Sequence, residues 1–292
     1  MLQTISAHTG ISERQVSAVI SLLDEKATIP FIARYRKERT GSLDEVQITA
    51  ISNEYNRMQE LQARRQTILH TIEEQGKLTD ALRSRIEHCW DAVELEDIYL
   101  PYKPHRKTRA DIAIEKGYEP LAMQLLRQDG KPFPKDEEAL QYARDILAEY
   151  IARDERARAA IRREFSYSAV ITTRSKTAPK ELSARDAVLW QQQADNYRDY
   201  MKVSEPLKRI SSHRYLAIRR AEEEGFIRVD ISADEEKCLD KLANLFLRNR
   251  SDAAYQVELA MEDSYKRLLK PSIETEFAAL AKKKADTEAI MV

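Results

Sequence analysis

The chain has 292 residues, of which 42% are hydrophobic, and this is enough for a sizeable core and about two domains of average length. Its 6 glycines and 9 prolines are too few for the chain reversals of β-sandwiches, propellers and doubly wound sheets, so we predict a mostly helical protein. The 48 basic and 49 acidic residues give a net charge of -1, which excludes a global basic field for nucleic acid and leaves only local patches.

The first predicted elements are two helices, 2–8 and 12–25, with a turn between them. Ser6, Gly10 and Val16 occupy the small, turn and apolar positions of a helix-turn-helix motif. However, the exposed side of the second helix carries several acids, which would repel phosphates. We therefore interpret this pair as a packing unit and do not expect its second helix to read DNA.

A basic segment follows the second helix. It contains three candidate phosphate contacts, Arg34, Arg36 and Lys37. Tyr35 adds an aromatic face on which a base could stack. The alternative is a solvated loop, or arginines that pair with acids such as Asp44 and Glu45, and the balanced local charge favours this alternative.

The longest periodic run of apolar residues comes next and predicts a long helix. Ser42 and Glu45 have the spacing of a capping box at its start, and Gly76 is expected to end it in the left-handed conformation. The following helix, which starts near Thr79, ends in four acids: Asp91, Glu94, Glu96 and Asp97. Four carboxylates could hold a hard cation or act as an acid/base pair, but we expect them to pair with the basic loop behind them.

Two windows without acids are the strongest binding candidates, because positive charge gathers there without internal neutralisation. The first is a basic loop with Lys103, Arg106, Lys107 and Arg109. The second lies between Pro206 and Ala221 and holds Lys208, Arg209, Arg214, Arg219 and Arg220. Each window can equally be an internal joint that anchors acidic helices.

The remaining elements complete an all-α prediction: a multi-helix N-terminal region with helix-turn-helix-like elements and at most one short β hairpin or strand. The alternating residues 226–231 are the best strand candidate, whereas residues 167–180 are either a short strand or a loop. A polar stretch before residue 205 suggests a division into domains 1–195 and 196–292. The pattern is still helical at Val292, so we expect a truncated protein.

Chemistry-bearing motifs are scarce. The sequence has no Gly-x-Ser-x-Gly, no phosphate loop and no paired histidines at metal spacing. Cys89 and Cys238 have neither metal-ligand spacing nor the density of a disulfide framework, as expected in a reducing cytoplasm. No signal peptide or membrane span is predicted. We expect no catalytic residues, no metal ligands, no cofactor and no enzymatic activity.

Several long motifs nevertheless resemble one family. The run Ile29-Pro-Phe-Ile-Ala-Arg-Tyr-Arg-Lys-Glu-Arg-Thr-Gly-Ser-Leu-Asp-Glu45 is similar to the signature segment of the Tex family, bacterial transcription accessory proteins related to a eukaryotic transcription elongation factor. Further matches follow in family order at Gln75–Leu78, Leu95–Pro104, Lys107–Ala110 with Glu115–Ala122, and Tyr197–Ala217.

The resemblance implies a cytoplasmic, nucleic-acid-associated protein with an all-helical N-terminal half. Family members continue into an RNase H-like domain, helix-hairpin-helix elements and an OB-fold RNA-binding domain. Because the family's nucleic-acid affinity is attributed chiefly to that last domain, this chain is expected to bind RNA or single-stranded DNA weakly. The resemblance implies no catalytic residue in this region.

Two further hypotheses stay open. The chain could be a protein-protein docking module on RNA polymerase or a ribosome-associated partner, with the basic windows against an acidic protein surface. An enzyme such as a nuclease is the third hypothesis, but the sequence lacks a constellation for the chemistry.

Overall fold

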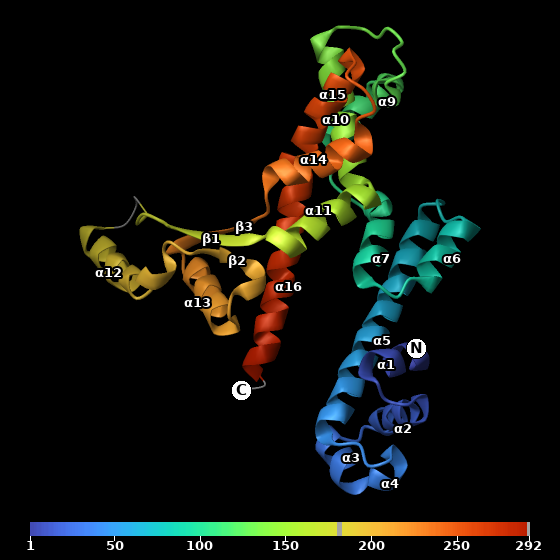
Figure 1. The fold of residues 1–292 in the computed structure, drawn as a ribbon, viewed down its shortest axis with the longest axis vertical. Coiled ribbons are helices and arrows are strands. Elements are labelled where there is room, and N and C mark those ends of the chain that lie inside the picture. Colours follow the sequence, from blue (N-terminus) through green and yellow to red (C-terminus); the bar gives the residue numbers. More distant parts are fainter. Residues whose placement is uncertain (180–182, 291–292) are drawn as a thin grey trace. The chain divides into compact units, whose positions relative to one another are not determined.

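The structure is a computed structural model that describes residues 1–179 and 183–290. Most of these residues are helical and one small sheet accompanies them (Figure 1), so the all-α fold class is confirmed. No helix in the described residues is both long and apolar enough to cross a membrane. The chain divides into two compact units, Met1–Pro104 and His105–Val292.

The first unit is entirely helical. Its elements are α1 (Leu2–Thr9), α2 (Glu13–Asp24), α3 (Ile29–Tyr35), α4 (Lys37–Thr40), α5 (Glu45–Glu74), α6 (Asp80–His88), α7 (Ala92–Tyr99) and the 3-10 helix η1 (Leu100–Tyr102). The long helix α5 lines two separate apolar clusters. Its first half packs with α1 to α3 around Ile5, Val16 and Ile32, and its second half packs with α6 and α7 around Ile86 and Leu95.

The glycine turns predicted in this unit are confirmed, whereas the capping box predicted for its long helix is not. Gly10 and Gly76 adopt the predicted left-handed conformation, with φ of 69° and 66°. The predicted capping box of Ser42 and Glu45 is wrong, because the box is formed by Asp44 and Gln47. Ser42 continues the left-handed turn with φ 62°, so its side chain does not cap the helix, whose N-cap, Asp44, lies two residues later.

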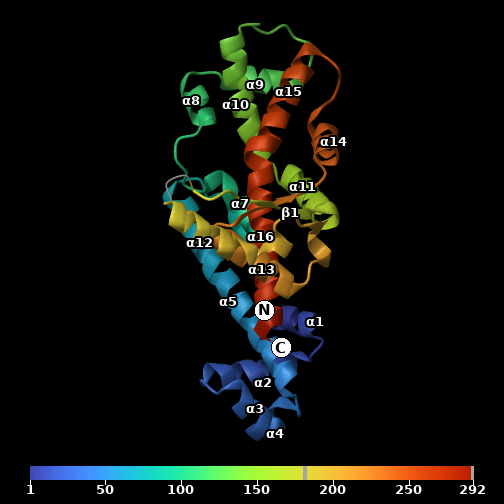
Figure 2. The same cartoon turned by 90° about the vertical axis from the view of Figure 1, so that its left-hand side faces the viewer.

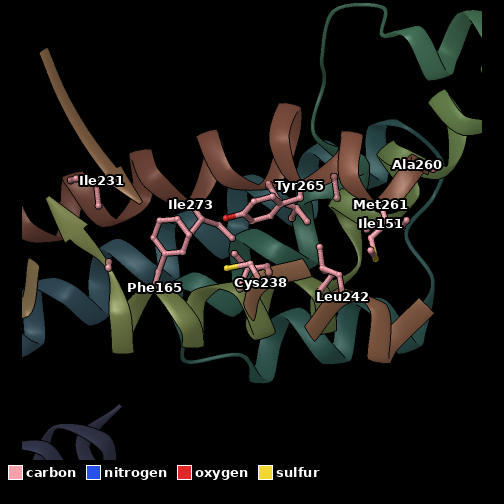
Figure 3. Close-up of a cluster of buried hydrophobic side chains, with 14 of the residues drawn as sticks. Ile151, Phe165, Ile231, Cys238, Leu242, Ala260, Met261, Tyr265 and Ile273 are labelled. Atoms are coloured by element: carbon pink, nitrogen blue, oxygen red, sulfur yellow. The ribbon is translucent and has the colours of Figure 1, made fainter. Parts of the chain in front are cut away.

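The second unit surrounds one large apolar cluster. Its helices are α8 (Arg109–Glu115), α9 (Glu119–Arg127), α10 (Glu137–Arg153), α11 (Glu155–Ser168), α12 (Ala184–Asp195), the 3-10 helices η2 (Arg198–Tyr200) and η3 (Leu207–Arg209), α13 (Ser212–Glu223), α14 (Glu235–Phe246), α15 (Asp252–Asp263), the π-helical turn η4 (Ser264–Leu269) and α16 (Lys270–Ile290). Helices α10 and α15 lie side by side in Figure 1 and Figure 2. Figure 3 shows how Phe165, Cys238, Tyr265 and Ile273 meet between the helices of this unit.

The small sheet joins segments far apart in the sequence. Its strands are β1 (Val170–Ser175), β2 (Ser204–Pro206) and β3 (Ile227–Ser232), in the order β2-β1-β3, and both pairings are antiparallel. The strand predicted near 226–231 is therefore present as β3, and the undecided segment 167–180 contains β1. Sequence reasoning missed β2, whose three residues are too few to show alternation.

The predicted division between 1–195 and 196–292 falls inside the second unit. Strand β1 lies before residue 195, whereas both of its partners lie after it, and Ile171 opposite Ile231 is buried in the common core. The polar stretch that suggested a boundary covers the end of α12 and the connection to β2, where most side chains are exposed. The polar composition of this stretch therefore reflects its exposure to solvent and does not mark a domain boundary.

Candidate nucleic-acid interface

The basic segment 34–39 lies on the two short helices α3 and α4. Ile32 and Ala33 bury the inner face of α3, so Arg34 is directed outward and is exposed. Lys37 is also exposed at the start of α4. Neither side chain takes part in an ion pair within the described residues. Arg34 therefore does not pair with Asp44 or Glu45, and Asp44 caps α5 instead, while the alternative of a solvated surface stays open.

Aromatic rings accompany these cations. Phe31 and Tyr35 are one helical turn apart on α3, with ring centroids 5.4 Å apart and an interplanar angle of 42°. The half-buried Arg36 places its guanidinium 4.9 Å from the centre of the Phe31 ring and donates from Nη1 to the carbonyl of Tyr35 at 3.0 Å. Sequence reasoning missed Phe31; its spacing of four residues from Tyr35 inside a basic run was the available signal.

The surface is held in place by α2. The side chain of Gln15 donates from Nε2 to the carbonyl of Thr40 at 3.2 Å. Gly41 ends α4 with φ 67°, and a Cβ at this position would lie 3.0 Å from the same nitrogen. Glycine is required here for its positive φ and for the close approach of Gln15.

The basic loop crosses from the first unit into the second. Lys103 belongs to the first unit and Arg106, Lys107 and Arg109 belong to the second. All four side chains are exposed. Lys107 pairs with Glu115 at 2.5 Å, while in the described parts of the chain the other three form no ion pair.

The loop ends in a well-formed helix start. Thr108 and Asp111 make a capping box at α8, in which Asp111 Oδ2 accepts from the Thr108 N–H at 2.7 Å. This backbone hydrogen bond lowers the pKa of the Asp111 carboxyl, because it stabilises the ionised form. The capping box therefore fixes the backbone at the start of α8, and with it the position of Arg109, the first residue of the helix.

The acids that precede the loop do not serve as its counter-charges in the way we predicted. Glu96 pairs with Arg64 at 2.6 Å, and Glu94 lies 3.9 Å from Arg85. The helix also does not end in these acids: Asp91 begins α7 by accepting from the backbone N–H groups of Val93 and Glu94. In the residues that the structure describes, Asp91, Glu94 and Glu96 form no ion pair with a cation of the basic loop, so these three acids do not neutralise it.

The second window divides into structural and exposed cations. Arg214 lies 2.7 Å from Glu205 and Arg219 lies 2.6 Å from Glu222, and both arginines are partly buried. These two positions fit the alternative of an internal joint. Arg209 and Arg220 are exposed and, among the residues that the structure describes, make no ion pair.

Lys208 of the same window is linked to an aromatic residue. Its Nζ donates to the carbonyl of Tyr167 at 3.2 Å and lies 4.8 Å from the centre of the Tyr167 ring. Tyr167 is a second exposed aromatic beside a cation that sequence reasoning missed.

One groove in the first unit collects titratable groups. It has a volume of about 610 Å³ and its lining includes His8, His88, Cys89, Asp91 and Glu94. Most of these groups already have partners: His8 Nδ1 lies 2.6 Å from Glu54, and the Cys89 thiol donates to the Asp91 carbonyl at 3.2 Å. Burial raises the pKa of the Cys89 thiol, which keeps it in the weakly nucleophilic protonated form. No group of three or more metal-ligating side chains suited to an ion occurs in 1–179 or 183–290.

Comparison with known proteins identifies relatives along the whole chain. Residues 1–73 match the Tex-like protein N-terminal domain, and residues 116–292 match the Tex central region-like family. The chain is 36% identical to the uncharacterized protein YdcI of Bacillus subtilis over 99% of this chain and 41% of that protein. It is 38% identical to the transcriptional accessory protein Tex of Neisseria gonorrhoeae over 77% of this chain and 30% of that protein.

A more distant human relative, the S1 RNA-binding domain-containing protein 1, is 27% identical over all of this chain and 31% of its own length. The chain thus spans less than half the length of each of these curated relatives.

Proposed function

The chain belongs to the Tex family, and from this premise we propose that it is the helical scaffold portion of a cytoplasmic, nucleic-acid-associated transcription accessory protein. Its two units present local cationic surfaces that make auxiliary contacts with the phosphates of RNA or single-stranded DNA. The α1–α2 pair serves this scaffold as a helix-turn-helix-like packing unit. The names of the relatives, a transcriptional accessory protein and an S1 RNA-binding domain-containing protein, support this role.

The pairing state of the predicted cations carries the proposal. Of the twelve candidates, Lys107, Arg214 and Arg219 have an acidic partner, and within the described residues the other nine have none. A chain with net charge -1 has enough acids to neutralise every cation, so unpaired cations clustered in short segments form local positive potential. Such clusters bind polyanions by releasing condensed counterions.

A charge-reversal variant tests this proposal at the basic loop. Lys103, Arg106, Lys107 and Arg109 are all changed to Glu, and binding of a fluorescein-labelled single-stranded RNA is followed by anisotropy across a salt titration. We expect weaker binding and a shallower dependence of log Kd on log salt, because fewer counterions are released. Helicity measured by circular dichroism should stay unchanged, since all four side chains are exposed.

The matched control reverses four exposed lysines that already have acidic neighbours: Lys131, Lys266, Lys282 and Lys284. Both variants undergo the same change in net charge. Equal binding by the wild type and the basic-loop variant, or an equal loss in the two variants, would refute the proposal of auxiliary contacts at this loop.

A docking module on RNA polymerase or a ribosome-associated protein is the second candidate, and helix α12 favours it. Val188 and Leu189 are neighbours on this helix and remain 57% and 49% exposed. Adjacent exposed apolar side chains are typical of protein contact sites. Partner capture that persists at high salt, and that Val188→Ser with Leu189→Ser abolishes, would support this function; capture that vanishes with salt or nuclease would count against it.

We also propose that the chain is not an enzyme. Support comes from the groove beside His8 and His88, where the thiol is protonated and Asp91 is committed to capping α7. Incubation of labelled RNA with the chain and magnesium should leave the RNA intact. Cleavage that copurifies with the protein and is lost in His8→Ala or His88→Ala would contradict this proposal.

A further inference from the structure

We propose that Phe31 and Tyr35, with Arg34 and Lys37, form a base-stacking site for single-stranded nucleic acid on α3 and α4. This inference rests on the proposed function and specifies the form of nucleic acid that this surface accepts. It also gives the aromatic pair a role that the phosphate contacts alone do not require.

Packing does not account for the two rings. The inner face of α3 is formed by Ile32 and Ala33, and Ile29 contacts the same cluster. Phe31 and Tyr35 lie outside this face and are 39% and 62% exposed. Two large aromatic side chains thus remain in contact with water although the core of the unit is filled by other residues. An exposed aromatic pair of this kind is a feature of recognition surfaces.

The geometry leaves Tyr35 as the open ring. Phe31 is covered by the guanidinium of Arg36 at 4.9 Å and supports Tyr35 through the tilted contact at 5.4 Å. The hydrogen bond from Arg36 to the backbone carbonyl of Tyr35 holds the guanidinium over Phe31, and the Tyr35 ring is held by its contact with Phe31. A pre-ordered ring loses little conformational entropy when a base stacks on it.

Two exposed cations lie within two residues of Tyr35 in the sequence and are the candidates for phosphate contacts. Arg34 precedes Tyr35 and Lys37 follows Arg36, and both are exposed. The nearest acid in the sequence, Glu38, is outnumbered in residues 34–39, and Arg39 is already engaged with Glu25 at 3.3 Å. An aromatic face between unpaired cations matches the combination of stacking and phosphate contact by which proteins bind single strands.

Single strands fit this surface better than duplexes. In a duplex, each base is stacked between its neighbours, so the face of a base cannot reach an aromatic side chain on the protein surface. An unpaired base can rotate out and place its face on Tyr35. Phosphate contacts alone would serve either form, whereas the ring contributes to binding only when a base is free.

The experiment compares three variants by anisotropy with a labelled 15-nucleotide oligouridine and with a duplex RNA of equal length, each over the same salt titration. Tyr35→Ala should raise the Kd for oligouridine about fivefold or more, the value that corresponds to the low end of base-aromatic stacking. Tyr35→Phe, which keeps the ring, should bind like the wild type. The salt dependence of Tyr35→Ala should keep its slope, because no charge is removed.

Tyr255→Ala is the matched control. Tyr255 is also a helical tyrosine, 56% exposed, but Asp252 and Glu258 are its neighbours at three residues on α15. This variant should leave both affinities unchanged.

Each outcome separates the inference from the proposed function. If the wild type binds oligouridine and Tyr35→Ala binds it equally well, the stacking site is refuted while auxiliary phosphate binding stands. If Tyr35→Ala loses the same affinity for oligouridine and for the duplex, the preference for single strands is refuted. Absence of binding by the wild type to either RNA at low salt would refute the proposed function and the inference with it.

Discussion

The most informative stability prediction concerns Gln128, a buried polar residue at the end of α9. Its side chain donates from Nε2 to the Phe246 carbonyl at 2.8 Å and accepts the Arg248 N–H on Oε1 at 2.9 Å. Its own carbonyl accepts from Asn249 Nδ2 at 2.8 Å. One residue therefore ties α9 to the segment that follows α14, more than a hundred residues later.

We expect Gln128→Ala to lower the free energy of unfolding of the second unit substantially. The substitution leaves the Phe246 carbonyl and the Arg248 N–H without partners, and each unsatisfied buried group costs about 1–3 kcal/mol. Backbone strain does not change, since φ at this residue is 52° and Ala is no better suited to that conformation than Gln. The expected loss is about 2–6 kcal/mol for the two groups together.

Urea unfolding followed by circular dichroism measures this loss, with Asn249→Ala as the control. That variant removes two side-chain hydrogen bonds, one to the Gln128 carbonyl and one from the Ser251 N–H, but Asn249 is exposed, so the loss should be only about 1–2 kcal/mol. A smaller loss of unfolding free energy in Gln128→Ala than in the control would refute the reasoning. The two side-chain hydrogen bonds of Gln128 would then be no better than hydrogen bonds to water.

Three further predictions address the first unit and the loop behind it. Gly41→Ala should lower the free energy of unfolding by about 1–2 kcal/mol, because alanine at φ 67° is strained; an unchanged urea midpoint would contradict it. The Arg57 side chain lowers the pKa of Glu54 through its hydrogen bonds, so the resulting stabilisation is present above about pH 4.3 and is lost as pH falls through the lower folded value. Arg57→Ala should therefore flatten the acid end of a Tm-against-pH curve, and parallel curves would refute that linkage. Thr108→Val removes the cap of α8 and should cost about 1 kcal/mol; an unaltered Tm would show that this cap is dispensable.

Helices were predictable from sequence wherever an apolar stripe meets a core. The stripe through Ile48, Ile51, Ile68 and Ile72 predicted the long helix correctly, because both clusters of the first unit pack on α5. The predicted N-cap of this helix, Ser42, lies two residues before the observed N-cap, Asp44. Ser42 and Asp44 are both good capping residues, and only the left-handed turn at Gly41 decides between them.

The sheet and the boundary between the two units depend on contacts between segments that are far apart in the sequence. No local sequence pattern contains this information. Residues 204–206 form a strand only because Val170 to Thr172 pair with them. The same pairing binds both sides of the predicted boundary into one unit. Local composition indicates exposure at such a position but carries no information about which distant segment pairs with it.

The candidate interface was half predictable for a similar reason. Unbalanced charge singled out the two windows without acids but not the segment 34–39, and Arg214 in the second window is paired with Glu205, which lies just outside that window. Pairing is a property of side-chain geometry, so sequence alone could not separate Arg214 from Arg209. Phe31 was missed because an apolar residue beside Ile32 suggests the core, whereas the helix rotates it to the surface.

Ultraviolet crosslinking of the chain to oligouridine, followed by mass spectrometry of the peptides, tests the central claim most directly. Localised cationic surfaces on a helical frame predict adducts concentrated in peptides that contain residues 29–39 and 103–109. Adducts spread evenly over the chain, or concentrated on the acid-flanked peptide that contains Tyr255, would contradict the account.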